Sequence, residues 1–98
     1  MRTSLFNTLN EWLDVENIID KNDAKIAEQI VSDIGTIIKK EVSPIDLNLL
    51  DEVLWGYDSI QVINQCSKDP RNIVSIGNSI VEDYILQEES YLLMNEMM

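Results

Sequence analysis

The stretch IAEQIVSDIGTIIKK, residues 26–40, decides the fold class of this 98-residue chain. Its apolar side chains recur three and four positions apart, which is the spacing of one face of an α-helix. They are Ile26, Ala27, Ile30, Val31, Ile34, Ile37 and Ile38. Lys39 and Lys40 lie in the last turn, where cations complement the helix dipole. The spacing predicts a central helix that begins at Asn22 or Asp23, and Gly35 within it indicates close approach of a neighbouring helix.

Helical spacing continues on both sides of this segment. Ser4 is a suitable N-cap for a first helix, which we expect to run to about Ile19. Ser43 and Pro44 predict the N-cap and the first residue of a third helix, with Gly56 as its terminator. The predicted core face of this third helix consists of Leu47, Leu50, Val53, Leu54 and Tyr57.

Two further helices are expected in the second half of the chain. Asp58 or Ser59 can cap a short fourth segment, which ends at Asp69-Pro70. The same Asp-Pro pair can open a last helix that reaches about Met94. We expect the apolar side chains at the end of this helix to pack against something, and they offer a route to self-association. These are Leu92, Leu93, Met94, Met97 and Met98.

Residues 73–81 leave two alternatives open. Gly77-Asn78 lies between two short apolar runs, which is a signal for a β-hairpin. The helical spacing of apolar residues persists past the glycine, and this favours the helix. With the helical reading, the chain is predicted to form a single all-α domain over residues 1–98, a compact four- to five-helix bundle.

The composition narrows the classes of function. The chain has 18 acidic and 7 basic residues, a net charge of −11, and no histidine. A Ser-His-Asp or Cys-His catalytic unit and an imidazole metal site are therefore excluded, and the lone Cys66 can neither close an intrachain disulfide nor build a zinc site. We predict a protein that is not an enzyme and uses no metal or cofactor. Direct binding to nucleic acid or to an anionic membrane is disfavoured by charge repulsion. The sequence has no apolar run long enough for a membrane-spanning helix, and the expected location is cytoplasmic.

The negative charge is concentrated in particular segments. Residues 42–67 contain four acidic residues and no basic one. Within this stretch Asp51 and Glu52 precede Trp55 by four and three positions, so all three can form one patch on the outer side of a helix. The predicted partner-binding residues are Asp51, Glu52, Trp55, Tyr57 and Asp58, with Glu82, Asp83, Glu88 and Glu89 of the last helix as secondary candidates.

A short motif suggests an alternative. The run Gly56-Tyr57-Asp58-Ser59-Ile60 resembles the Asp-Ser-Leu/Ile attachment site of acyl and peptidyl carrier proteins, which are also small, acidic and helical. The resemblance implies that Ser59 carries a phosphopantetheine arm. It covers about five residues, and Asp69-Pro70 interrupts the helix that follows the serine in those proteins. A plain helix cap at Ser59 explains the same residues.

The functional prediction follows from charge, size and the lack of a catalytic motif. We expect a small acidic protein that neutralises a basic protein partner, in the manner of an immunity protein or antitoxin that blocks a toxin such as a nuclease. A nuclease presents positive charge to its substrate, so an acidic inhibitor gains steered association and competes with phosphate. A nucleic-acid-mimicking phage inhibitor is a further alternative at this level.

Overall fold

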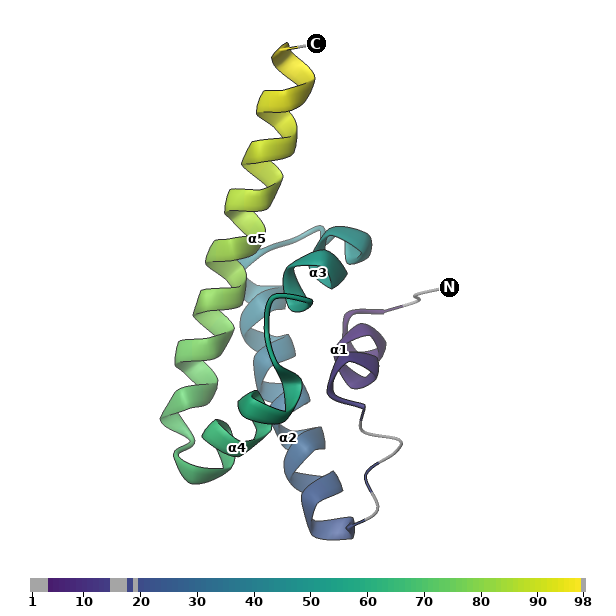
Figure 1. Ribbon diagram of the computed structural model, residues 1–98, viewed down its shortest axis with the longest axis vertical. Helices are drawn as coiled ribbons and strands as arrows, with labels where there is room; N and C mark the ends of the chain where they lie inside the picture. The colour runs from purple at the N-terminus through teal and green to yellow at the C-terminus, as the bar shows by residue number, and fades with distance from the viewer. Residues whose placement is uncertain (1–3, 15–17, 19, 98) are drawn as a thin grey trace.

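A computed structural model describes residues 4–14, 18 and 20–97 of the chain, with side chains described as far as residue 94. This part of the molecule forms five helices and no strand (Figure 1). They are α1 (Leu5–Leu13), α2 (Lys21–Glu41), α3 (Leu47–Leu54), α4 (Ser59–Lys68) and α5 (Arg71–Met97). The prediction of an all-α helical bundle is confirmed.

Helix α2 supplies much of the core, as its apolar stripe predicts. Ile34 and Ile38 are almost completely buried, and the helix packs against α1, α4 and α5. Two details of the prediction are wrong. The helix begins at Lys21 rather than at Asn22 or Asp23, because Asp20 accepts hydrogen bonds from both of these amides and is itself the N-cap. Ile26, at the edge of the stripe, is exposed.

Helix α1 is shorter than the predicted segment to Ile19. Ser4 caps it as expected and accepts a hydrogen bond from the amide of Asn7. The helix ends at Leu13 because Asp14 adopts the left-handed conformation (φ 56°, ψ 42°), and its amide bonds the carbonyls of the last turn. Residues 15–17 and 19 of the predicted segment lie outside the described residues.

Two glycines allow the helices to approach closely. A methyl group placed on Gly35 would lie 2.5 Å from Cε1 of Phe6 in α1, which agrees with the predicted close approach. A methyl group on Gly77 of α5 would lie 2.9 Å from Cδ1 of Ile37 in α2. Both distances are shorter than a van der Waals contact, so a side chain at either position would require the facing Phe6 or Ile37 side chain to move.

Helix α3 begins later than predicted. Ser43 and Pro44 precede the helix and do not cap it, because the N-cap is Asp46, whose Oδ1 accepts hydrogen bonds from the amides of Asn48 and Leu49. The predicted core face packs as expected, with Leu50 and Leu54 fully buried and the other members packed against the core. Leu49, which the prediction omitted, is also buried.

The caps of the next two helices are also set by aspartates. Asp58 caps α4, so Ser59 is the first helical residue and not the cap. Asp69 and Pro70 separate α4 from α5 as predicted. The carboxylate of Asp69 accepts a hydrogen bond from the backbone amide of Arg71. Its Oδ2 also forms an ion pair with the guanidinium of Arg71, with an N–O distance of 2.8 Å.

Helix α5 runs without interruption through Gly77-Asn78, so residues 73–81 form a helix and not a hairpin. At 1.5 Å per residue its 27 residues span about 40 Å, and its C-terminal half extends beyond the other helices (Figure 1). Ile80, Val81 and Tyr84 are buried, but every residue from 85 to 94 is exposed. The expectation that the apolar end packs is therefore wrong within this chain for Leu92, Leu93 and Met94, each of which is more than half exposed. The side chains of Met97 and Met98 lie outside the described part.

Candidate partner-binding surface

The start of α3 is fixed against α5 by a long-range hydrogen bond. The backbone amide of Asp46 donates to the hydroxyl of Tyr84 at 2.9 Å, across 38 residues of sequence. Tyr84 is only 1% exposed, so this contact anchors the N-cap of α3 on the buried part of α5. The rest of α3 is thereby aligned beside the exposed continuation of α5.

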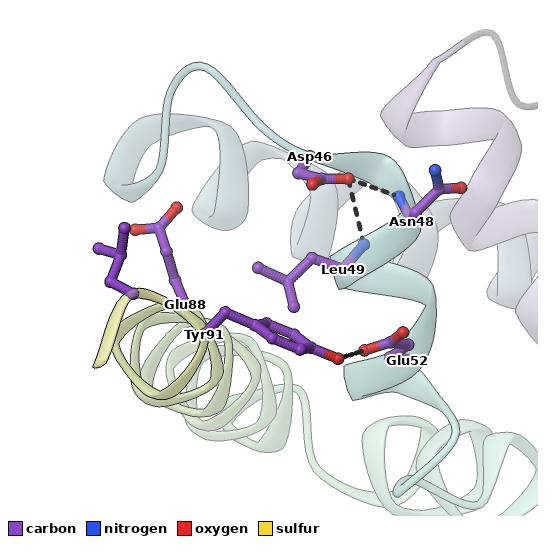
Figure 2. A pocket seen from close by; sticks show the side chains of 7 residues that line it. Asp46, Asn48, Leu49, Glu52, Glu88 and Tyr91 are labelled. Carbon is purple, nitrogen blue, oxygen red and sulfur yellow. Dashed lines mark hydrogen bonds between the residues drawn. The ribbon is translucent and has the colours of Figure 1, made fainter. Parts of the chain in front are cut away.

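A groove lies between these two helices. It has a volume of about 380 Å³ and is open to solvent at its mouth. From the α3 side it is lined by Asp46, Asn48, Leu49 and Glu52. From α5 it is lined by Glu88, Tyr91 and Leu92. Figure 2 shows Leu49 and the Tyr91 ring directed into the space, with Asp46 and Glu88 at its border.

The two walls are joined by a hydrogen bond at one end. The hydroxyl of Tyr91 donates to Oε2 of Glu52 at 2.8 Å, across 39 residues of sequence (Figure 2). This contact lays the aromatic ring across the floor of the groove. Glu52 thus places a carboxylate at this end of the groove, and Tyr91 gives the groove an aromatic surface.

The groove carries negative charge and apolar surface together. Three of its seven lining residues are acidic, and none is basic. Leu49 is buried beneath it, while Leu92 is 58% exposed at its edge. Such a surface is complementary to a group that combines positive charge with apolar area.

A second groove provides a contrast. It has a volume of about 350 Å³ and lies where α1 meets the end of α2 and the start of α3. Its lining includes Lys39 and no acidic residue, with mainly apolar or hydroxyl side chains otherwise. Acidic side chains therefore line the groove between α3 and α5 and are not found in the second groove.

Of the predicted patch on α3, only Glu52 lines the groove. Trp55 is the C-cap residue and is 82% exposed, and Glu52 is exposed one turn earlier. Asp51 is half-buried. Trp55 does not line the groove, so the structure places Glu52 in the groove and Trp55 outside it.

Tyr57, which is half-buried, and Asp83, which is exposed, are brought together by the fold. The phenol of Tyr57 donates to a carboxylate oxygen of Asp83, and Oγ of Ser79 lies 2.7 Å from the phenol oxygen. Burial raises the pKa of Tyr57, and the hydrogen bond to Asp83 raises it further. These contacts tie the turn between α3 and α4 to α5, so both residues have a structural role.

The remaining predicted residues are distributed over the surface. Asp58 uses its carboxylate as the N-cap of α4, and Ser59 is half-buried in the first turn. Glu82, Glu88 and Glu89 are all exposed on α5. Of these three, Glu88 lines the groove, where it joins Glu52 of the predicted set.

Five groove residues were not among the predicted binding residues. Asp46 was assigned to the interior of a helix that in fact begins after it, and Leu49 was omitted from the core face. Leu92 was expected to be part of a packed tail, and Asn48 and Tyr91 had no predicted role. The sequence does contain a signal, since Tyr91 follows Tyr84 by seven positions and so continues the buried stripe of α5 past the end of the core.

The described residues contain neither a cluster of metal ligands nor a helix that could cross a membrane. Within the described residues, no group of three or more His, Cys, Asp or Glu side chains could hold a metal ion, and this includes the carboxylates of the groove. Within the same residues, no helix has both the length and the apolar character needed to cross a bilayer. Comparison of the chain with protein-family models, with curated proteins and with solved structures finds no match.

Proposed function

We propose that this chain is a binding protein that neutralises a basic protein partner, as an immunity protein or antitoxin does when it covers the active or nucleic-acid-binding surface of a toxin such as a nuclease. On this proposal it acts by occupying a surface and not by catalysis. The observation that carries the proposal is the groove between α3 and α5, where acidic side chains from two distant parts of the sequence meet beside exposed apolar ones.

Charge and apolar area have separate roles in such an interface. A net charge of −11 attracts a basic partner at long range and accelerates encounter. Apolar and aromatic side chains supply most of the binding energy once water is excluded. The groove offers Tyr91 and Leu92 for this second role, with Glu52 and Glu88 beside them.

An inhibitor of this kind also has to block the partner's access to nucleic acid, its usual ligand. A nuclease binds phosphate through lysine and arginine side chains, and that contact weakens as salt rises. Carboxylates presented in a groove compete for the same side chains. The proposal therefore predicts binding that weakens with salt and that blocks the partner's access to nucleic acid.

The test is a pull-down from the native host with tagged wild-type protein and two double variants. Glu52→Lys with Glu88→Lys alters the groove, and Glu28→Lys with Glu41→Lys alters exposed positions of α2. Each pair changes the net charge by the same four units, from −11 to −7. We expect the wild type and the α2 control to recover one basic protein that the groove variant loses.

The recovered protein is then purified and its activity on nucleic acid measured with increasing amounts of this chain. Stoichiometric inhibition by the wild type supports the proposal. Recovery of no basic protein, or full activity of the partner when it is saturated with the chain, rejects it. Circular dichroism of each variant shows whether the helices remain intact.

A further inference from the structure

The groove between α3 and α5 has a polar rim and an apolar floor. Asp46 and Glu88 stand at its border, and the Tyr91 ring and Leu49 are directed into it (Figure 2). One oxygen of Asp46 is used in capping α3. A ligand that fits must therefore carry its positive charge at the end of an elongated apolar stem.

We propose that this groove receives an arginine side chain of the partner, presented from a segment that is both basic and apolar. The inference rests on the proposed function and specifies its contact. The guanidinium lies at the rim beside Asp46 and Glu88, and the methylene stem packs on Leu49 and Leu92. The ring of Tyr91 forms the floor beneath it.

The chemistry of the lining favours arginine over lysine. A guanidinium is planar, binds carboxylates through paired N–H donors and stacks on aromatic rings, whereas an ammonium is a compact and strongly hydrated charge. Tyr91 offers the aromatic surface, and Glu88 is an exposed carboxylate. The volume of about 380 Å³ is at the small end for ligand pockets, which suits a side chain better than a whole helix.

The surroundings indicate what flanks the arginine. Next to the groove, α5 exposes Ile85, three positions before Glu88, and Met94, three positions after Tyr91. Exposed apolar side chains beside a charged groove are typical of interaction sites. A partner segment with apolar residues on either side of its arginine covers them.

Charge argues against a second copy of the chain as the occupant. Residues 72–98 contain five acidic residues and no basic one, so two copies of α5 placed side by side repel each other. Three acidic residues also line the groove itself. A basic partner removes this repulsion, whereas self-association increases it.

The experiment uses a fluorescein-labelled peptide of about 15 residues, in which arginines alternate with leucine pairs. A sibling peptide carries citrulline, a neutral isostere, in place of each arginine. Binding to the whole protein is measured by fluorescence anisotropy at low salt. We expect the arginine peptide to bind and the citrulline peptide to bind at least about tenfold more weakly.

Matched variants separate position from net charge. Glu88→Gln and Glu89→Gln each remove one negative charge from neighbouring exposed residues of α5, but only Glu88 lines the groove. Leu92→Gln and Leu86→Gln make the corresponding apolar pair. We expect the groove variants to weaken binding by about 3- to 10-fold and the controls by less than about twofold.

Three results overturn the inference: no binding of the arginine peptide, equal binding of the citrulline peptide, or equal effects of the groove variants and their controls. Sedimentation provides a further test. A dimer that Leu92→Gln dissociates, and that the peptide does not displace, overturns the inference and identifies a second copy of the chain as the occupant. A host partner that is neutralised equally by the wild type and by Glu88→Gln with Leu92→Gln rejects the groove but leaves the proposed function. Selective peptide binding without any basic host partner rejects the function instead.

Discussion

Helix α5 consists of two halves that have different relations to the bundle. In the first, Ile80 and Tyr84 are buried, and Gly77 lies against Ile37 of α2. In the second, every residue from 85 to 94 is exposed, although the backbone remains helical. The same helix thus passes from a structural element of the core to a projection that includes one wall of the acidic groove.

The difference shows where helical stability comes from. Most helices in proteins are stabilised by packing of an apolar face, and short isolated helices are marginal in water. The first half of α5 has such packing, whereas the second half has the contact of Tyr91 with Glu52 and little burial. The second half is therefore the part of the molecule that gains most from a partner.

The largest expected effect comes from removing a core side chain of the first half. Ile80→Ala should cost about 2–5 kcal/mol of unfolding free energy, because Ile80 is completely buried and a cavity remains. Leu86→Ala, six residues later and 62% exposed, should cost less than about 0.5 kcal/mol. Urea denaturation measures both. Equal losses would show that the second half is also packed in solution.

The next effect tests the close contact between α5 and α2. Gly77→Ala should destabilise the protein by about 1 kcal/mol, because the added methyl group lies 2.9 Å from Cδ1 and 3.3 Å from Cβ of Ile37, so the Ile37 side chain has to shift. We expect this cost to exceed the gain in helix propensity from glycine to alanine. Asn78→Ala is the control, since the next residue is exposed and alanine should stabilise the helix by a few tenths of a kcal/mol. Stabilisation by Gly77→Ala in thermal unfolding would contradict the contact.

The helical spacing of apolar residues predicts the helices well because it follows burial. It does not predict where a helix begins when a contact with a distant residue sets that boundary. Ser43-Pro44 has the right chemistry for a helix start, but the amide of Asp46 bonds the hydroxyl of Tyr84, and no local pattern contains that contact. The end of α1 depends on a left-handed Asp14, a conformation that a residue other than glycine seldom adopts.

The candidate site follows the same rule. Glu52 and Glu88 were predicted from local charge, and the structure places both in one groove. Their convergence depends on α3 lying beside α5, which is a property of the tertiary fold. Tyr57 and Asp83 were predicted as partner-binding residues, but they bond each other because the turn after α3 packs on α5.

The bond between Tyr57 and Asp83 leads to a prediction at high pH. Burial raises the pKa of Tyr57 in the folded protein above its usual value of about 10, so folding favours the neutral phenol. This stabilisation is complete below the unfolded pKa and is lost as pH rises through the folded pKa. Above about pH 10 the unfolding free energy should therefore fall more steeply in the wild type than in Tyr57→Phe. Parallel curves in denaturant titrations would show that Tyr57 does not contribute, since Tyr84 and Tyr91 are present in both proteins.

The smallest effect tests the contact between the second half of α5 and the bundle. Tyr91→Phe keeps the ring and removes the hydrogen bond to Glu52, which is exposed and should contribute about 0.5 kcal/mol or less. Global stability should hardly change, but hydrogen exchange of amides 86–94 should accelerate by a factor of about two. Tyr84→Phe is the opposite case, because it removes the buried acceptor for the Asp46 amide and should cost about 1–2 kcal/mol across the whole fold. If Tyr91→Phe also lowered global stability by this amount, the two halves of α5 would unfold as one unit, and the second half would belong to the core despite its exposure.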